Sequence, residues 1–251
     1  MENIIMIHVH LPTIIGICAH APRSGKDTLA DYIEREAETK GLRYFRIAFG
    51  DLLREVVSTL FGMNSRDYVM AALLGSMKDV AHGRYSIRNL ENESLKEFLI
   101  GTLGLDPDEP RSPRFYMQRV GNDYVKGHLG LESMWVDAVG TQITTRLLYG
   151  NAPDLVIITD VRSPNEFDYV TECGFSVEVK TQGFPALTHS AKPDTSHPVE
   201  NHRFDCDFVF TNVYGDMQSL QYQLRESGLI DAVIERNEIL KQRVFEQEDY
   251  Q

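Results

Sequence analysis

Residues 14–33, IIGICAHAPRSGKDTLADYI, combine the signals of a buried strand, a loop and an amphipathic helix. The first five residues, IIGIC (14–18), form a continuous apolar run, which is typical of a strand buried on both faces of a sheet. From Ser24 to Lys40, apolar residues recur at helical spacing, and Gly41 follows as a helix terminator. The order of strand, loop and helix predicts an α/β protein.

The loop carries the sequence SGKDT (24–28), which predicts phosphate binding. Backbone N–H groups and the positive end of a helix can surround a phosphate, while a lysine, here Lys26, reaches its outer oxygens. Gly25 allows the close approach of the backbone that a Cβ would obstruct. The usual pattern, G-x-x-x-x-G-K-[ST], is changed at two positions: His20 replaces the first glycine, and Asp27 replaces the hydroxyl residue that normally holds magnesium.

Two interpretations of this tetrapeptide compete. In the first, Asp27 holds Mg²⁺ directly or through its water shell, and Thr28 still donates to a phosphate. In the second, SGKD is only a helix terminus, with Ser24 as its N-cap and Asp27 in the first turn. The buried strand before it and the amphipathic helix after it favour the phosphate loop.

Strand-like and helix-like patterns alternate along the rest of the chain. Further strands are predicted at 44–49, 155–159, 176–180 and 208–212, and further helices at 51–61, 114–128, 135–148, 165–173, 216–226 and 231–245. This alternation predicts a single α/β domain over residues 1–251, with three layers in which helices flank a mostly parallel sheet. Ligands of such sheets bind at the carboxyl ends of the strands, and residues 20–28 and 160–166 both follow predicted strands.

Residues 62–113 differ from this pattern. They are polar, contain Gly75, Gly83, Gly101 and Gly104, and end in LDPDEPRSPR, where three prolines interrupt any regular element. We interpret them as a lid or insertion region, partly helical around 66–81 and 93–103. An ordinary surface excursion is the alternative.

Composition excludes several classes of function. The net charge of −12 argues against a protein that coats nucleic acid, and against attraction to an anionic membrane surface. No apolar run reaches membrane-spanning length, and the N-terminal stretch lacks the features of a signal peptide. The three widely spaced cysteines (Cys18, Cys173 and Cys206) indicate buried thiols in a reducing cytoplasm.

Three later segments complete a pattern that begins with SGKDT. They are YMQRVGNDYVKGHLGLESMWVDAV (116–139), IITDVRSPNEFDYV (157–170) and HPVENHRFDCDFVFTN (197–212). In this order the chain resembles the deoxynucleoside monophosphate kinases of tailed bacteriophages, and the resemblance covers roughly residues 14–225. It implies a P-loop kinase-like fold, ATP as phosphate donor, Mg²⁺, a dNMP acceptor and location in the host cytoplasm. A homodimer is a possible assembly, and no stable nucleic-acid binding is implied.

The resemblance also implies roles for individual residues. Contacts to the phosphate donor would come from Arg23, Ser24, Gly25, Lys26, Asp27 and Thr28, with Asp27 as the metal ligand. The acceptor site would use Arg114, Gly121, Asn122, Trp135, Asp160, Arg162 and Glu166, although Asn122 stands where the family often has Thr. Lys26, Asp160 and Arg162 would be catalytic, because phosphoryl transfer depends on positioning and on cations between two anionic substrates.

Structural alternatives accompany several of these residues. Asp160 and Arg162 could form a salt bridge at a strand end, and the lone Trp135 could belong to the core. Arg54 is a weaker phosphate-clamp candidate, and Asp51 is interpreted as a helix N-cap. The spacing of His189, His197 and His202 fits no closed zinc pattern, and we expect loop hydrogen bonds there, with His197 and Glu200 bracing the pocket.

Other functions also fit the sequence. The chain could be another GKD-type small-molecule kinase, similar to phosphomevalonate kinases. It could also be a nucleotide-binding regulator without turnover, if Asp27 disables catalysis. The nature of the acceptor distinguishes the first alternative, and ATP consumption in its presence distinguishes the second.

Overall fold

The computed structural model describes residues 11–18, 24–183 and 202–248. Contacts between Cα atoms divide the chain into two units. One unit combines residues 1–49 with 139–251, and the other comprises residues 50–138. Each unit is described by itself.

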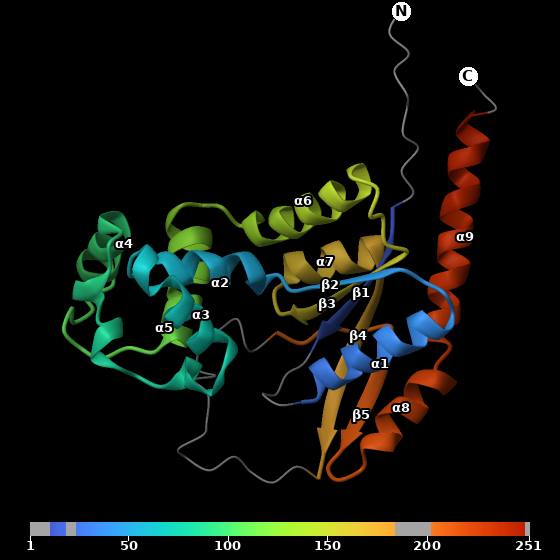
Figure 1. Ribbon diagram of the computed structural model, residues 1–251, viewed down its shortest axis with the longest axis horizontal. Coiled ribbons are helices and arrows are strands. Elements are labelled where there is room, and N and C mark those ends of the chain that lie inside the picture. Colours follow the sequence, from blue (N-terminus) through green and yellow to red (C-terminus); the bar gives the residue numbers. More distant parts are fainter. Residues whose placement is uncertain (1–10, 19–23, 184–201, 249–251) are drawn as a thin grey trace, which may run out of the picture. The chain divides into compact units, whose positions relative to one another are not determined.

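The first unit is built on a five-stranded sheet (Figure 1). Its strands are β1 (Thr13–Cys18), β2 (Tyr44–Ile47), β3 (Leu155–Val161), β4 (Gly174–Gln182) and β5 (Phe208–Val213). All four pairings are parallel, and the order across the sheet is β2-β3-β1-β4-β5. The expected α/β class and parallel sheet are therefore confirmed. β1 lies in the centre, which agrees with its apolar sequence, because a central parallel strand is covered on both faces.

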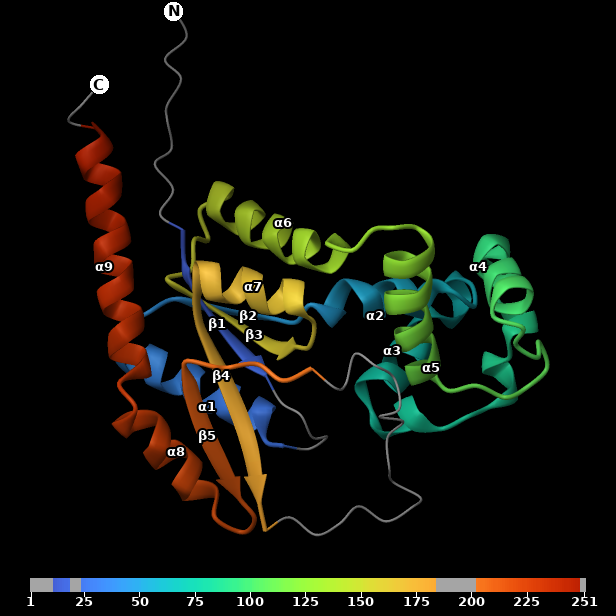
Figure 2. The same ribbon diagram turned by 180° about the vertical axis from the view of Figure 1, so that it is seen from behind.

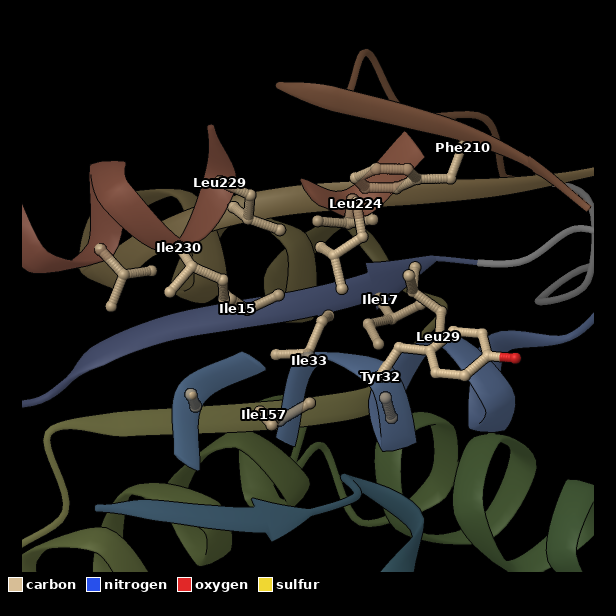
Figure 3. Close-up of a cluster of buried hydrophobic side chains, with 14 of the residues drawn as sticks. Ile15, Ile17, Leu29, Tyr32, Ile33, Ile157, Phe210, Leu224, Leu229 and Ile230 are labelled. Atoms are coloured by element: carbon tan, nitrogen blue, oxygen red, sulfur yellow. The ribbon is translucent and has the colours of Figure 1, made fainter. Parts of the chain in front are cut away.

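Helices cover both faces of this sheet. On one face, α1 (Lys26–Thr39), α8 (Met217–Glu226) and the start of α9 (Leu229–Glu248) share a buried cluster with alternate residues of the strands. Figure 3 shows Ile15 and Ile17 of β1 pointing toward Leu29 and Ile33 of α1. On the other face, α7 (Pro164–Cys173) approaches β1 so closely that a Cβ at Gly16 would lie 2.5 Å from Val170 Cγ2. The unit therefore has three layers, helix–sheet–helix.

The strands form because their side chains are buried on both sides. Leu155, Val156, Ile157 and Ile158 of β3 are all fully buried, as are Ile15 and Ile17 of β1. Burying a side chain of this size contributes roughly 1.5–3 kcal/mol relative to leaving it exposed. α9 is fixed to the amino end of the same strands by Asn237, which accepts a hydrogen bond from Thr13 Oγ1 at 2.6 Å and donates one to the Asp154 carbonyl at 2.9 Å.

The second unit is helical. In chain order its elements are α2 (Gly50–Thr59), η1 (Met63–Ser65), α3 (Arg66–Leu74), η2 (Ser76–Asp79), η3 (Gly83–Tyr85), η4 (Ile87–Asn89), α4 (Glu93–Glu97), η5 (Phe98–Thr102), α5 (Pro113–Gln118), η6 (Arg119–His128) and the start of α6 (Met134–Leu148). Tyr116 is fully buried in its core, where the hydroxyl donates to the Tyr85 carbonyl at 2.6 Å and Phe61 packs edge-on against the ring. The helices expected around 66–81 and 93–103 are α3 with η2 and α4 with η5.

The expected helix at 114–128 is confirmed as one continuous helical stretch, formed by α5 and then by the π-helical segment η6. The structure corrects two other details of the sequence interpretation. Asp51 is not an N-cap, because α2 already begins at Gly50, and its carboxylate pairs instead with Arg54 one turn on. Of the three cysteines only Cys18 is buried; Cys173 and Cys206 are half-buried, and all three are free thiols. Over the described ranges, no helix is long and apolar enough to cross a membrane.

Candidate functional site

The carboxyl ends of β1 and β3 lie side by side in the first unit. Cys18, the last residue of β1, pairs with Val161, which stands between Asp160 and Arg162. The helix that follows β1, α1, lies on one face of the sheet, and the helix that follows β3, α7, lies on the other face (Figure 2). Adjacent strands whose connections leave to opposite faces form a topological switch point, the place where parallel α/β sheets usually bind ligands.

The pairing of β1 with β3 shifts register near the carboxyl ends of these strands. Gly16 pairs with Ile158, but Cys18 pairs with Val161, so β3 has one more residue than β1 over this interval. Such a bulge bends the strand and changes the direction of the side chains near it. The bulge lies at Thr159 and Asp160, next to Cys18, the last residue of β1.

The start of α1 is fixed by the last strand of the sheet. Asn212, in β5, donates from Nδ2 to the Ser24 carbonyl at 2.8 Å. Gly25 follows with φ of +92°, and a Cβ at this position would overlap Asn212 Nδ2. Glycine is required here for two reasons, its backbone conformation and the space that the amide of Asn212 occupies.

The capping interpretation of Ser24 is wrong. The N-cap of α1 is Gly25, which offers no side chain, and no side-chain cap bond is formed. The Ser24 hydroxyl is buried and has no hydrogen-bond partner in the described part of the chain. A buried hydroxyl without a partner is costly unless a ligand or water satisfies it. Arg23 and His20 lie outside the described residues.

Replacing Gly25 with alanine should therefore cost more stability than the same change at Gly41. Gly41 also has a positive φ, of +72°, but a Cβ there meets nothing within 4 Å. We expect Gly41→Ala to lose about 1 kcal/mol, the cost of the backbone conformation alone. Gly25→Ala adds the displacement of Asn212 and the loss of its bond to Ser24, so the total should reach about 2 kcal/mol or more.

Denaturant unfolding of both variants measures this difference. The double variant Gly25→Ala/Asn212→Ala removes the overlap, so its loss should be smaller than the sum of the two single losses. Equal losses for Gly25→Ala and Gly41→Ala, or strict additivity in the double variant, would contradict the role given to Asn212.

A cluster of charges surrounds the first turn of α1. Lys26 Nζ lies 2.9 Å from Asp27 Oδ1, and Arg46 Nη2 lies 3.1 Å from the same oxygen. Arg46 also pairs with Asp31 at 2.6 Å and lies 3.6 Å from Glu34. Burial would raise the pKa of Asp27, but the hydrogen bonds and charges of Lys26 and Arg46 outweigh it, so that the pKa lies below its usual value. The carboxylate is therefore ionised at neutral pH, as a metal ligand must be.

Arg46 and Asn212 were not among the candidate site residues of the sequence analysis. Arg46 is the one charged residue of β2, YFRI, and a charge inside an apolar strand is the signal that could have found it. The three acidic partners on α1 (Asp27, Asp31 and Glu34) recur at helical spacing, which would place them on one face toward the arginine. Asn212 carries no comparable local signal.

The end of β3 contributes Asp160, Arg162 and Glu166. Asp160 Oδ1 accepts a hydrogen bond from the Phe49 backbone N–H at 2.7 Å, which ties β3 to the segment after β2. Arg162 is exposed. Glu166 is buried and caps α7, because its Oε2 accepts from the backbone N–H groups of Arg162 at 2.8 Å and Ser163 at 3.1 Å. This capping gives Glu166 a structural role, and its expected contact with the acceptor stays a prediction.

The remaining residues expected at the acceptor site belong to the second unit. Arg114 pairs with Asp79, and Asn122 Nδ2 donates to the Gln118 carbonyl at 3.3 Å. A Cβ at Gly121 would lie 2.7 Å from Leu53 Cδ2, so packing explains this glycine. Trp135 is 4% exposed and donates from Nε1 to the Gly121 carbonyl at 3.3 Å, which agrees with the core alternative. The structure thus brings Ser24–Thr28 and Asp160–Glu166 together in one unit and places the other four candidates in the second.

The histidine-rich loop is only partly described. His189, His197 and Glu200 lie outside the described residues, and His202 is exposed. Within the described ranges, no group of three or more His, Cys, Asp or Glu side chains could hold a metal ion.

Comparison with known proteins adds no assignment. No protein-family model matches the chain, and no curated protein matches it. The function must be argued from the residues at the carboxyl ends of β1 and β3.

Proposed function

We propose that the chain is an ATP-dependent kinase that transfers a phosphoryl group to a deoxynucleoside monophosphate, giving ADP and a dNDP. The pairing of Cys18 with Val161 is the observation that carries this proposal. It brings the strand that leads to Lys26 beside the strand that leads to Arg162, so the two cations proposed for donor and acceptor phosphates follow neighbouring strand ends. Phosphoryl transfer requires such positive charge on both sides of the moving group.

The residues at the start of α1 fit a bound triphosphate. The first backbone N–H groups of a helix have no intrahelical partner and carry partial positive charge, so they can bind an anion. The Ser24 hydroxyl, buried without a described partner, can donate to a phosphate oxygen. Lys26 is 28% exposed and pairs with Asp27, an ionic contact that a phosphate can replace.

A single carboxylate at this position suits Mg²⁺. Magnesium is usually held by one or two carboxylates together with substrate phosphates and water, rather than by a protein cage. Asp27 is ionised and 66% exposed, and it lies in the first turn of the helix that would hold the phosphates. When bound, the ion would neutralise phosphate charge during transfer.

Each residue of the proposed site would have its own role in phosphoryl transfer. Lys26 holds the outer phosphate oxygens of the donor, and Arg162 binds the acceptor phosphate or the moving group through its planar fork. Asp160, fixed by the Phe49 N–H, orients groups at the same strand end. Arg114, Gly121, Asn122 and Trp135 remain the proposed residues for the acceptor.

An ADP-release assay over the four dNMPs, the corresponding NMPs and phosphomevalonate tests the proposal directly. Turnover that requires a dNMP supports it. Turnover with phosphomevalonate alone would assign the chain to another class of small-molecule kinase. Binding of ATP without turnover on any acceptor would indicate a nucleotide-binding regulator.

Removing the carboxylate of Asp27 should weaken the binding of the magnesium that turnover requires. We expect Asp27→Ala to need a higher Mg²⁺ concentration for half-maximal turnover, and Asp27→Ser to recover part of the loss by restoring the common GKS form. Asp31→Ala is the matched control, because Asp31 pairs with the same Arg46 one turn along α1. Its magnesium curve should equal that of the unmodified protein. Identical magnesium curves for the unmodified chain, Asp27→Ala and Asp27→Ser would leave Asp27 a purely structural role.

A further inference from the structure

Two cysteines from distant parts of the chain lie on the same face of the sheet. Cys18 ends β1, and its side chain points to the face covered by α7, as does the adjacent alternate position Gly16, which packs on Val170. Cys206 belongs to the segment 202–207, which crosses this face before entering β5 (Figure 2). The crossing makes an approach between residues 18 and 206 possible although β4 separates their strands.

The crossing segment is held on both sides of Cys206. On one side, the ring of Phe204 stacks on Phe167 of α7 with centroids 4.5 Å apart and planes at 8°. On the other side, Asp207 Oδ2 accepts from both the backbone N–H and the hydroxyl of Ser176, each at 2.8 Å. These contacts fix the backbone around Cys206 without depending on its sulfur.

The two thiols shift each other's acidity in opposite directions. The hydrogen bond between them lowers the pKa of Cys206 against the opposing effects of burial and of Glu178. The same hydrogen bond, followed by burial, raises the pKa of Cys18. Cys206 is half-buried and Cys18 is buried. The more acidic and more accessible thiol is the one that meets an oxidant first.

We propose that Cys18 and Cys206 form a redox-sensitive pair that a hydroperoxide converts into a disulfide. The Cys206 thiolate attacks the peroxide oxygen, so that the O–O bond breaks and a Cys206 sulfenic acid and one water (or alcohol) form. The Cys18 sulfur then attacks the sulfenic sulfur, the S–O bond breaks, and a second water leaves with the Cys18 proton. Both thiols together lose two electrons, and the peroxide gains them.

Its position gives this disulfide a consequence for the candidate site. Cys18 is the residue from which the chain enters the Lys26 loop, and the segment of Cys206 leads into β5, where Asn212 holds Ser24. The bond would therefore tie the loop's entry to the same strand that already binds its exit. The cross-link would also raise thermal stability, because it constrains the unfolded chain over a long loop.

Peptide mapping tests the pair without reference to catalysis. The reduced full chain is treated with hydrogen peroxide, its remaining thiols are alkylated, and the digested peptides are identified by mass. We expect a linked peptide containing Cys18 and Cys206, a full-chain mass lower by two hydrogen atoms before alkylation, and alkylated Cys173. Dithiothreitol should remove the link, and the oxidised protein should melt at a higher temperature than the reduced one.

Three single serine variants provide the controls. Cys173→Ser should form the link as readily as the unmodified chain, whereas Cys206→Ser and Cys18→Ser should not form it. Because Cys206 is only half-buried, Cys206→Ser keeps the test usable if Cys18→Ser does not fold. Alkylation of Cys18 and Cys206 after peroxide treatment, a link that involves Cys173, or accumulation of Cys206 sulfinic acid while Cys18 stays alkylated would each overturn the proposal.

Discussion

Replacing Arg162 with alanine is expected to lower kcat/KM for dNMP phosphorylation by about 10³-fold or more, by analogy with arginines that stabilise phosphoryl transfer. The guanidinium follows the strand end that pairs with β1, where it can act on charge that redistributes in the transition state. The capping of α7 by Glu166 should survive, because its bond to Arg162 comes from the backbone N–H, which alanine retains. Arg162→Lys should recover little, since a point charge cannot replace the two-oxygen fork.

ATP titration, dNMP turnover and thermal melting of the same preparations decide this prediction. ATP affinity and melting temperature should change little while turnover falls. Arg225→Ala is a matched control, because Arg225 is also an exposed arginine. It pairs with Glu36, away from the carboxyl ends of the strands. If ATP affinity, turnover and melting temperature all fall together for Arg162→Ala, the residue has a structural role and the acceptor site lies elsewhere.

Replacing Lys26 with alanine should abolish transfer, with a loss of at least about 10³-fold in turnover, while the fold remains intact. Lys26 is the first residue of α1, where the donor phosphates are proposed to bind, and its Nζ pairs with Asp27. Its loss removes one of the two cations beside Asp27, but Arg46 remains in place. The stability cost should be small, since partly exposed ion pairs contribute about 1 kcal/mol or less.

Lys40→Ala is the matched control for this variant. Lys40 follows the last residue of the same helix, is exposed and pairs with Asp231 at 2.9 Å. Its replacement should leave turnover unchanged. A Lys26→Ala protein that turns over dNMP within about threefold of the unmodified chain would show that the phosphate-loop assignment is wrong.

The sequence was sufficient to predict the strands of the central sheet. IIGIC and LVIIT are continuous apolar runs, and both form strands that are buried on two faces. A strand buried on both faces needs apolar residues at every position, so it can be recognised from the sequence. The positions of helix starts were less predictable. Ser24 and Asp51 are good capping residues by type, yet Gly25 caps α1 and α2 starts one residue before Asp51. Local capping preference was overridden at Ser24 by the positive φ of Gly25 and its contact with Asn212.

Two residues of the candidate site, Arg46 and Asn212, were not predicted, because their place at the site depends on the order of the strands in the sheet. Arg46 lies on β2 and Asn212 on β5, and neither strand is a neighbour of β1 in the sheet. Their approach to the start of α1 follows from the way this helix crosses β3 and from the position of β5 beside β4. A local pattern does not encode that order, so the two residues could be found only once the sheet was assembled.

The bond between Asn212 and Ser24 also bears on how the chain becomes functional during its synthesis. Ser24 leaves the ribosome long before Asn212 is added, since β5 is the last strand of the described sheet in chain order. A nascent chain that ends before β5 can form the helix of Lys26, but it lacks the amide that holds the residue before Gly25. We therefore expect affinity for nucleotides to appear only late in translation, and chains arrested before residue 208 to bind ATP more weakly than chains that extend through α8.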